Sequence, residues 1–182
     1  YSYAARVAGY SSPTVFLPYL SDPSIFKPES TRAPAQRRVR VLAVSKLVWR
    51  EGVDDLIRAT LHLPAFELVI VGDGPLRAEY EKLAEASDDR IKFLGYLPFL
   101  KLPQEYARSD IFVHPGRYEP WGVTIQEAML CALPIVASDQ VVSARDLLPN
   151  FARWSYTPGD LDTLIHLLSE LSNDKLRRSV GE

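Results

Sequence analysis

Short β-branched runs alternate with segments of helical periodicity along most of this chain. The residues Val39–Val44 form one such run, and residues 67–71 form the next. Between them, residues 52–62 place their apolar side chains on one helical face. Parallel strands joined by crossover helices produce this rhythm. The sequence therefore predicts an α/β domain with a single doubly wound, mostly parallel sheet and helices on both faces.

The same alternation continues to the C-terminal end. Further strands are predicted at residues 91–94, 111–114, 135–137 and 154–156. Helices are predicted over residues 75–84, 100–108, 123–131 and 144–148, and a last helix begins after Asp160, whose side chain can cap it. Residues 1–38 are broken by prolines, so we interpret them as a leading segment or linker with one short strand at 14–17. The domain proper is expected to span residues 39–182.

Composition excludes several classes of protein. A chain of 182 residues with 47% hydrophobic residues can bury a sizeable core and is not disordered. The net charge of -2 excludes a strongly basic nucleic-acid binder. The longest charge-free run, residues 7–21, contains Pro13 and Pro18 and cannot be a membrane helix, and no signal peptide is visible. The single cysteine, Cys131, excludes an internal disulfide framework and is compatible with a reducing compartment.

The loop at residues 115–122 is the richest in chemistry, and it enters the predicted helix at 123–131. Ligands of open parallel sheets bind beyond the carboxyl ends of the strands, where this loop is expected. The N–H groups of Gly122, Val123 and Thr124 are free at a helix start, which favours a phosphate. Glu119 and Glu127 flank that start, and a carboxylate can accept hydrogen bonds from a vicinal diol. The pattern therefore suits a ligand in which a phosphate joins a sugar to a ribose.

The segment from Glu119 to Met129, read with residues 134–139, resembles the signature of family 4 (group 1) retaining glycosyltransferases of GT-B fold. Residues 44–57, 68–75, 91–95 and 107–115 resemble further strands and loops of that family, so the resemblance covers about residues 39–182. It implies a Rossmann-like domain that binds a nucleotide sugar. It also implies that the family's preceding domain, which binds the acceptor, is absent from this chain.

The resemblance assigns roles around the predicted helix start. Glu119 is expected to bind the hydroxyls of the donor sugar as the catalytic-site carboxylate, and Glu127 is expected to hold the ribose. The N–H groups of Gly122, Val123 and Thr124 are expected to meet the diphosphate or the sugar. No metal and no cofactor is implied, because GT-B enzymes stabilise the leaving diphosphate with basic side chains and helix dipoles.

The resemblance also assigns residues on two other loops to donor binding. Lys46 stands where the family usually has Arg and is expected to neutralise the β-phosphate. Leu94, Tyr96 and Leu97 lie where the nucleobase is gripped, partly through backbone groups. Arg50 is included as a second candidate cation for the phosphates.

Three positions depart from the family pattern. Glu51 replaces the usual Lys, which places an anion where a phosphate should come close. Ser45 replaces a usual Gly, and Val142 with Ser143 replaces a usual Gly-Gly pair. These departures keep open a variant or degenerate donor site.

The predicted function is hexose transfer from a nucleoside-diphosphate sugar to an acceptor hydroxyl, by front-face substitution in the intact enzyme. This chain alone is expected to be inactive in transfer, since the acceptor half is missing. The alternatives are a binding module that holds a nucleotide sugar without turnover and a GT-B epimerase, whose motifs the segment from Glu119 to Gly122 does not resemble. We expect no nucleic-acid partner and a cytoplasmic location; peripheral membrane contact at the inner face of the membrane stays open.

Overall fold

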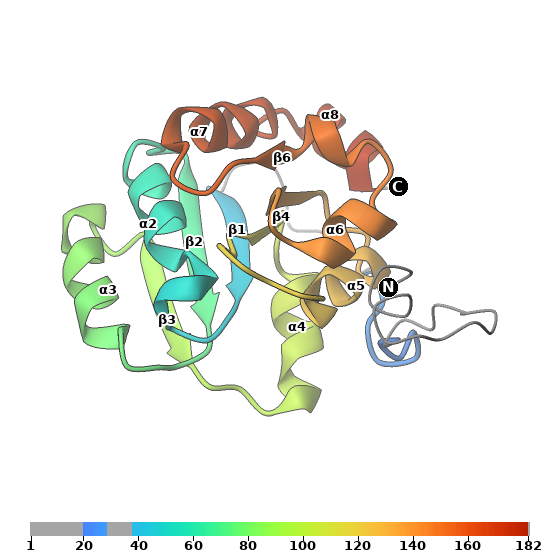
Figure 1. The fold of residues 1–182 in the computed structure, drawn as a ribbon, viewed down its shortest axis with the longest axis horizontal. Coiled ribbons are helices and arrows are strands. Elements are labelled where there is room, and N and C mark those ends of the chain that lie inside the picture. Colours follow the sequence, from blue (N-terminus) through green and yellow to red (C-terminus); the bar gives the residue numbers. More distant parts are fainter. Residues whose placement is uncertain (1–19, 29–37, 182) are drawn as a thin grey trace, which may run out of the picture.

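The computed structural model describes residues 20–28 and 38–181 (Figure 1). The predicted α/β fold class is confirmed, because the described residues form one six-stranded sheet whose pairings are all parallel. The order is β3-β2-β1-β4-β5-β6, so the chain reverses direction across the sheet between β1 and β4. The strands are β1 (Val39–Val44), β2 (Phe66–Val71), β3 (Ile91–Gly95), β4 (Ile111–His114), β5 (Ile135–Ser138) and β6 (Ser155–Tyr156). The predicted strand at 14–17 lies outside the described residues.

Helices cover both faces of the sheet (Figure 1). One layer holds α2 (Val53–Leu61), α3 (Arg77–Ala84), α7 (Leu161–Glu170) and α8 (Asp174–Gly181). The other holds α4 (Leu102–Ala107), α5 (Val123–Leu130) and α6 (Val142–Leu147). Short 3-10 turns span Trp49–Glu51, Glu85–Ser87, Phe99–Lys101 and Phe151–Arg153. Among the helices of the described ranges, none has both the length and the apolar character that crossing a membrane requires.

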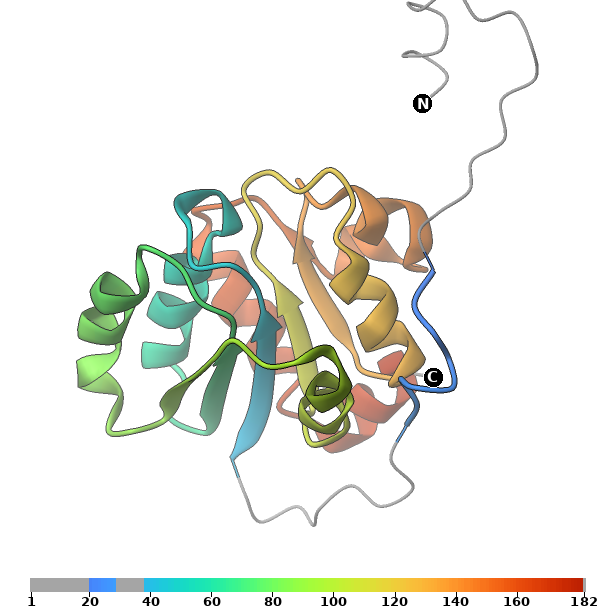
Figure 2. The same cartoon turned by 90° about the horizontal axis from the view of Figure 1, so that it is seen from below.

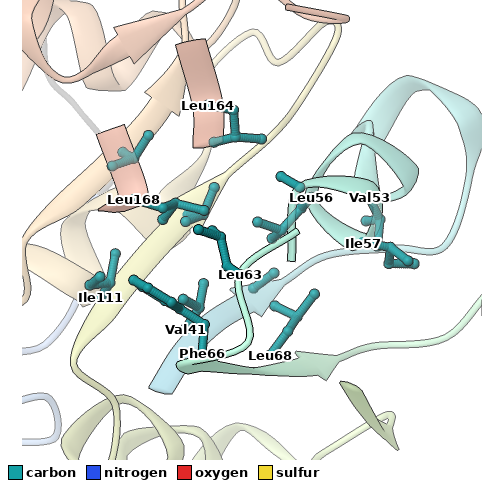
Figure 3. Packing of buried hydrophobic residues seen from close by; sticks show 14 of the residues in the cluster. Val41, Val53, Leu56, Ile57, Leu63, Phe66, Leu68, Ile111, Leu164 and Leu168 are labelled. Atoms are coloured by element: carbon teal, nitrogen blue, oxygen red, sulfur yellow. The ribbon is translucent and has the colours of Figure 1, made fainter. Parts of the chain in front are cut away.

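The strand pleat divides the core into two clusters. Val41 and Leu68 point into the cluster under α2 and α7 (Figure 3), whereas their neighbours Leu42 and Val69 point into the cluster under α4 and α5. Successive side chains of a strand point to opposite faces, so a strand buried on both sides must be apolar throughout. This explains why the central strands read as continuous β-branched runs in the sequence.

One predicted helix differs from the structure, and one observed helix was not predicted, each for a local reason. The segment predicted as a helix at 100–108 is a 3-10 turn followed by α4, whose first turn contains Pro103. Proline has no N–H and is tolerated in the first turn of a helix, so the regular helix begins here. The sequence also did not predict α8, whose composition is polar; its buried Arg177 donates hydrogen bonds to the carbonyls of Leu171 and Ser172, both at 2.7 Å.

The described part of the leading segment packs against the domain. Phe26 is buried and makes edge-to-face contacts with Phe99 and Tyr106, with ring centroids 5.6 Å apart in both pairs. The N–H of Ser21 donates to Oε1 of Gln126 at 3.2 Å, so the segment runs beside α5 (Figure 2). Residues 20–28 therefore complete the core on the α4–α5 face.

Candidate functional site

The loops before α2 and before α5 lie side by side at the carboxyl end of the sheet (Figure 2). The N–H of Arg117 donates to the carbonyl of Arg50 at 2.7 Å. On its other side, the loop at 115–122 is fixed by the N–H of Glu119, which donates to the carbonyl of Gln140 at 3.2 Å. The N–H of Ser143 donates to the carbonyl of Trp121 at 3.2 Å. Contacts with two neighbouring loops therefore set the conformation of the loop that carries Glu119.

Arg117 holds this loop to α2 through its side chain. Its guanidinium donates to both carboxylate oxygens of Asp54, at 2.8 and 2.9 Å, and to Oδ1 of Asp55 at 2.9 Å. It also donates to the carbonyl of Trp49 at 2.8 Å and lies over that ring. Burial raises the pKa of Asp55, and the charge of Arg117 opposes that rise. The sequence analysis did not predict this network. The adjacent acidic residues Asp54 and Asp55, in the first turn of the helix predicted at 52–62, were the sequence signal for a cationic partner.

The start of α5 offers unpaired donors. Gly122 precedes the helix with φ 77°, and a Cβ there would lie 3.1 Å from Cγ of Glu119 and 3.3 Å from Nε2 of His114. Within the described residues, the N–H groups of Gly122, Val123 and Thr124 have no hydrogen-bond acceptor. The hydroxyl of Thr124 is buried and likewise without a partner there. A ligand with several acceptor oxygens can satisfy such a set.

Glu127 lies on the second turn of α5 and is buried. Its Oε2 accepts a hydrogen bond of 2.6 Å from the hydroxyl of Tyr106, which is itself fully buried on α4. Burial raises the pKa of Glu127, and this hydrogen bond opposes the rise. Sequence reasoning did not anticipate Tyr106, which fixes the orientation of the predicted ribose-binding carboxylate.

Glu119, His114 and Glu51 come together on the other side of the α5 start. Oε1 of Glu119 accepts from the N–H of Trp121 at 3.0 Å. His114, at the end of β4, is only 4% exposed, and burial lowers its pKa to about 4 against the opposing charge of Glu119. Glu51 is 5% exposed, and burial, with a contribution from Glu119, raises the pKa of its carboxyl.

Three of the residues that depart from the family pattern make contacts here. The hydroxyl of Ser45 donates to Oε2 of Glu51 at 3.2 Å, and Nε of Arg50 lies 3.3 Å from Oε1 of Glu51. The hydroxyl of Ser143 donates to the carbonyl of Gly122 at 3.0 Å. Glu51 therefore pairs with Arg50 while remaining buried.

A cavity of about 400 Å³ opens at the ends of β1 and β2. Lys46, Tyr96 and Leu97, all predicted to bind the donor, are among its lining residues. Val44, Val71 and Leu102 supply an apolar wall, and Asp73 adds a carboxylate. Leu94 is not among the lining residues: it belongs to β3 and is 40% exposed. The structure thus places most of the predicted residues at the cavity, at the α5 start or at the two carboxylates that flank that start. Leu94 lies outside these groups, and Arg50 pairs with Glu51.

A parallel sheet in this order, which reverses between β1 and β4, defines a Rossmann-like class of α/β domain. The family model for glycosyl transferases group 1 matches residues 27–182. The chain belongs to this family, which confirms the resemblance seen in the sequence.

Several curated proteins are similar to the chain. It is 33% identical over 147 residues to the GDP-mannose-dependent monoacylated alpha-(1-6)-phosphatidylinositol monomannoside mannosyltransferase of Corynebacterium glutamicum, covering 74% of this chain and 38% of the relative. It is 30% identical over 141 residues to the sulfoquinovosyl transferase SQD2 of Arabidopsis thaliana, covering 73% of this chain and 27% of the relative. The chain therefore spans about a third of the length of these relatives.

Solved structures agree in fold. Sucrose-phosphate synthase from Thermosynechococcus elongatus superposes with a TM-score of 0.81 at 23% identity, covering 100% of this chain and 49% of that one. The C-terminal domain of the Francisella tularensis group 1 protein LpcC superposes with a TM-score of 0.76 at 20% identity, covering 89% of this chain and 93% of that one. Anabaena HepE, solved with UDP and glucose, superposes with a TM-score of 0.74 at 24% identity, covering 89% of this chain and 48% of that one.

Proposed function

We propose that this chain is the donor-binding half of a retaining glycosyltransferase that moves a hexose from a nucleoside-diphosphate sugar to an acceptor hydroxyl. One observation carries the proposal: the unpaired N–H groups of Gly122, Val123 and Thr124 lie between the carboxylates Glu119 and Glu127. The donors and the positive end of α5 suit a diphosphate. The flanking carboxylates suit the hydroxyl groups of the sugars at its two ends.

The nucleoside end of the donor occupies the Glu127 side. With Oε2 held by Tyr106, Oε1 of Glu127 is left to accept from the ribose diol. The base enters the cavity of about 400 Å³, against the side chains of Tyr96 and Leu97, and Lys46 at its rim neutralises the β-phosphate. Arg50, 48% exposed and paired with Glu51, is the second cation near this path.

The sugar end lies at Glu119, whose Oε2 has no hydrogen-bond partner within the described residues. In the transfer step, the bond between the anomeric carbon and the β-phosphate oxygen breaks, and the acceptor oxygen bonds to the same face of that carbon. The acceptor's proton passes to the leaving phosphate. Donors at the α5 start and Lys46 stabilise the charge that develops on this phosphate. In the form that the resemblance implies, no metal ion takes part.

The relatives support this donor class. The Corynebacterium glutamicum relative is named as GDP-mannose-dependent, and the Anabaena structure contains UDP and glucose. The chain spans about a third of the length of these relatives. We therefore propose that the whole protein has an N-terminal domain that binds the acceptor, that transfer retains the anomeric configuration, and that this chain alone is inactive in transfer. We also propose a cytoplasmic location and, for the whole protein, peripheral contact with a membrane.

A second candidate is a nucleotide-sugar-binding module without turnover. The buried carboxylate of Glu51 favours it, because that carboxylate stands where the family usually places a lysine. Product formation by the whole protein separates the two: transfer or hydrolysis of a donor supports the enzyme, and binding without either supports the module.

Donor binding is tested by thermal-shift screening of this chain with UDP, GDP, ADP and their sugar conjugates. For whichever nucleotide binds, Glu127→Ala should weaken the free diphosphate by about tenfold or more, because a charged hydrogen bond contributes roughly 1.5–3 kcal/mol. Glu119→Ala should weaken only the sugar conjugate. Exposed Glu85→Ala is the matched control and should change neither affinity. If Glu127→Ala binds the diphosphate as tightly as wild type, Glu127 does not hold the ribose. If Glu119→Ala loses equal affinity for both ligands, Glu119 does not bind the donor sugar.

A further inference from the structure

His114 carries an unused hydrogen-bonding nitrogen beside the proposed sugar end of the site. The residue ends β4, its side chain is only 4% exposed, and within the described residues its Nε2 has no hydrogen-bond partner. We propose that His114 determines donor specificity: its Nε2–H donates to a hydroxyl group of an uncharged hexose that Glu119 also binds. The role of His114 rests on the proposed function and extends it to the class of hexose that the donor carries.

Two glycines fix where the imidazole ring points. A Cβ on Gly116 would lie 3.0 Å from Cε1 of His114, and a Cβ on Gly122 would lie 3.3 Å from Nε2. The same Cβ on Gly122 would lie 3.1 Å from Cγ of Glu119 and 3.3 Å from Oγ of Ser143. Three polar side chains therefore face the space beside Gly122, which only a residue without a side chain leaves open.

Hydrogen bonding and burial decide which proton the ring carries. Nδ1 of His114 accepts a hydrogen bond of 3.3 Å from the N–H of Gly116, so Nδ1 carries no proton. Burial lowers the pKa of His114 to about 4 against the opposing charge of Glu119, so at pH 7 the ring is neutral and its one proton lies on Nε2. A sugar hydroxyl can accept from this Nε2–H and donate its own proton to Oε2 of Glu119, which has no partner within the described residues.

Ser143 adds an acceptor to the same space. Its hydroxyl donates its proton to the carbonyl of Gly122 at 3.0 Å, so the lone pairs of Oγ are left to accept. The resemblance places a glycine at this position in related proteins, so the acceptor is a feature of this chain. The subsite thus offers one donor and two acceptors, which complements a hexose with neighbouring hydroxyl groups.

The charges of the subsite disfavour an anionic sugar. A carboxylate oxygen of Glu51, one of Glu119 and a ring nitrogen of His114 all lie within 4.8 Å of one another. Arg50 pairs with Glu51 at 3.3 Å, but its side chain is 48% exposed, so solvent screens much of its charge. The neutral ring of His114 adds no positive charge. A carboxylate or sulfonate on the sugar would therefore meet like charge in a buried site, whereas a hydroxyl-bearing, uncharged hexose would not.

The role of His114 is tested by calorimetry with UDP, GDP and ADP and with UDP-glucose, GDP-mannose and ADP-glucose. The quantity measured is the ratio of the affinity for a conjugate to the affinity for its free diphosphate. His114→Leu should lower this ratio about fivefold or more and leave the affinity for the free diphosphate unchanged, because only the sugar loses a buried hydrogen bond. His114→Gln keeps an amide N–H near the position of Nε2 and should retain most of the ratio. His166→Leu makes the same change at an exposed position of α7 and should alter neither affinity.

The outcomes separate this role from the proposed function. An unchanged ratio in His114→Leu, or equal losses for the conjugate and the free diphosphate, overturns the role of His114 and leaves the proposed function intact. If none of the three diphosphates binds to the wild-type chain, the proposed function fails and the role of His114 fails with it. If His114→Leu does not fold, His114→Met, of similar volume, takes its place with the same expected loss.

The charge of the sugar is tested with the matching uronate conjugate of the nucleotide that binds: UDP-glucuronate, GDP-mannuronate or ADP-glucuronate. Each differs from its hexose conjugate only in the carboxylate at C6. The uronate conjugate should bind at least about fivefold more weakly than the hexose conjugate, and Glu51→Gln should narrow this difference. Equal or tighter binding of the uronate conjugate by the wild-type chain overturns the selection for an uncharged hexose.

Discussion

Tyr106→Phe isolates the hydrogen bond that orients Glu127. The substitution keeps the ring, which packs against Phe26 and Phe112 with centroids 5.6 and 5.5 Å away, and removes only the 2.6 Å donor to a buried carboxylate. A hydrogen bond to a charged group contributes about 1.5–3 kcal/mol. For a chain of this length, each kcal/mol shifts the melting temperature by roughly 2–4 °C, so the variant should melt about 3–12 °C lower at pH 7.5.

The loss should depend on pH in a fixed direction. Burial raises the folded pKa of Glu127 above its unfolded value, so stability falls as pH rises through the interval between the two. The hydroxyl of Tyr106 lowers the folded pKa of Glu127. Removing this hydroxyl therefore raises the folded pKa further, and the pH interval over which stability falls extends to higher pH. The gap between wild type and Tyr106→Phe should therefore be widest at pH 7.5 and shrink as the pH falls below the pKa of Glu127, where the carboxyl is neutral in both.

Thermal melts of both proteins between pH 4 and pH 8 measure this gap. Tyr80→Phe is the matched control, because the hydroxyl of Tyr80 is equally buried and has no hydrogen-bond partner among the described residues. Removing that hydroxyl should leave stability unchanged or raise it. A gap of the same size at both ends of the pH range, or a loss no larger than that of Tyr80→Phe, refutes the reasoning.

Three further changes test other parts of the fold and site. Arg117→Ala leaves the buried carboxylate of Asp55 with only the N–H of Gly159 and should cost about 3 kcal/mol in urea denaturation; a loss under about 0.5 kcal/mol would mean that the network is not structural. Gly122→Ala should destabilise the chain by about 1–2 kcal/mol because of its positive φ, and should weaken nucleotide binding in calorimetry; unchanged binding contradicts the placement of the diphosphate. Asp160→Ala removes the cap of α7 and should lower the melting temperature at neutral pH. Because hydrogen bonds from Thr163 lower the pKa of Asp160, that loss should fade as pH falls through the folded pKa, and a loss independent of pH contradicts it.

The sequence by itself determined the sheet and its chemistry-bearing loop. Strands β1 and β4 lie where the β-branched runs predict them, because strands buried on both faces must be apolar at every position. Asp160 caps α7 as predicted, accepting from the N–H of Thr163 at 3.1 Å. The free N–H groups at the α5 start were also readable, since a helix start leaves its first donors unpaired whatever surrounds it.

Contacts between residues far apart in the sequence were decided only by the tertiary structure. Tyr106 meets Glu127 because α4 and α5 pack side by side on one face of the sheet. Glu51 meets His114 and Glu119 because β1 and β4 are neighbours at the point where the strand order reverses. Local patterns report how a segment folds and which face it buries, but which charged side chains share a site depends on strand order. The burial of Glu51 among these groups therefore appears only once the sheet is assembled.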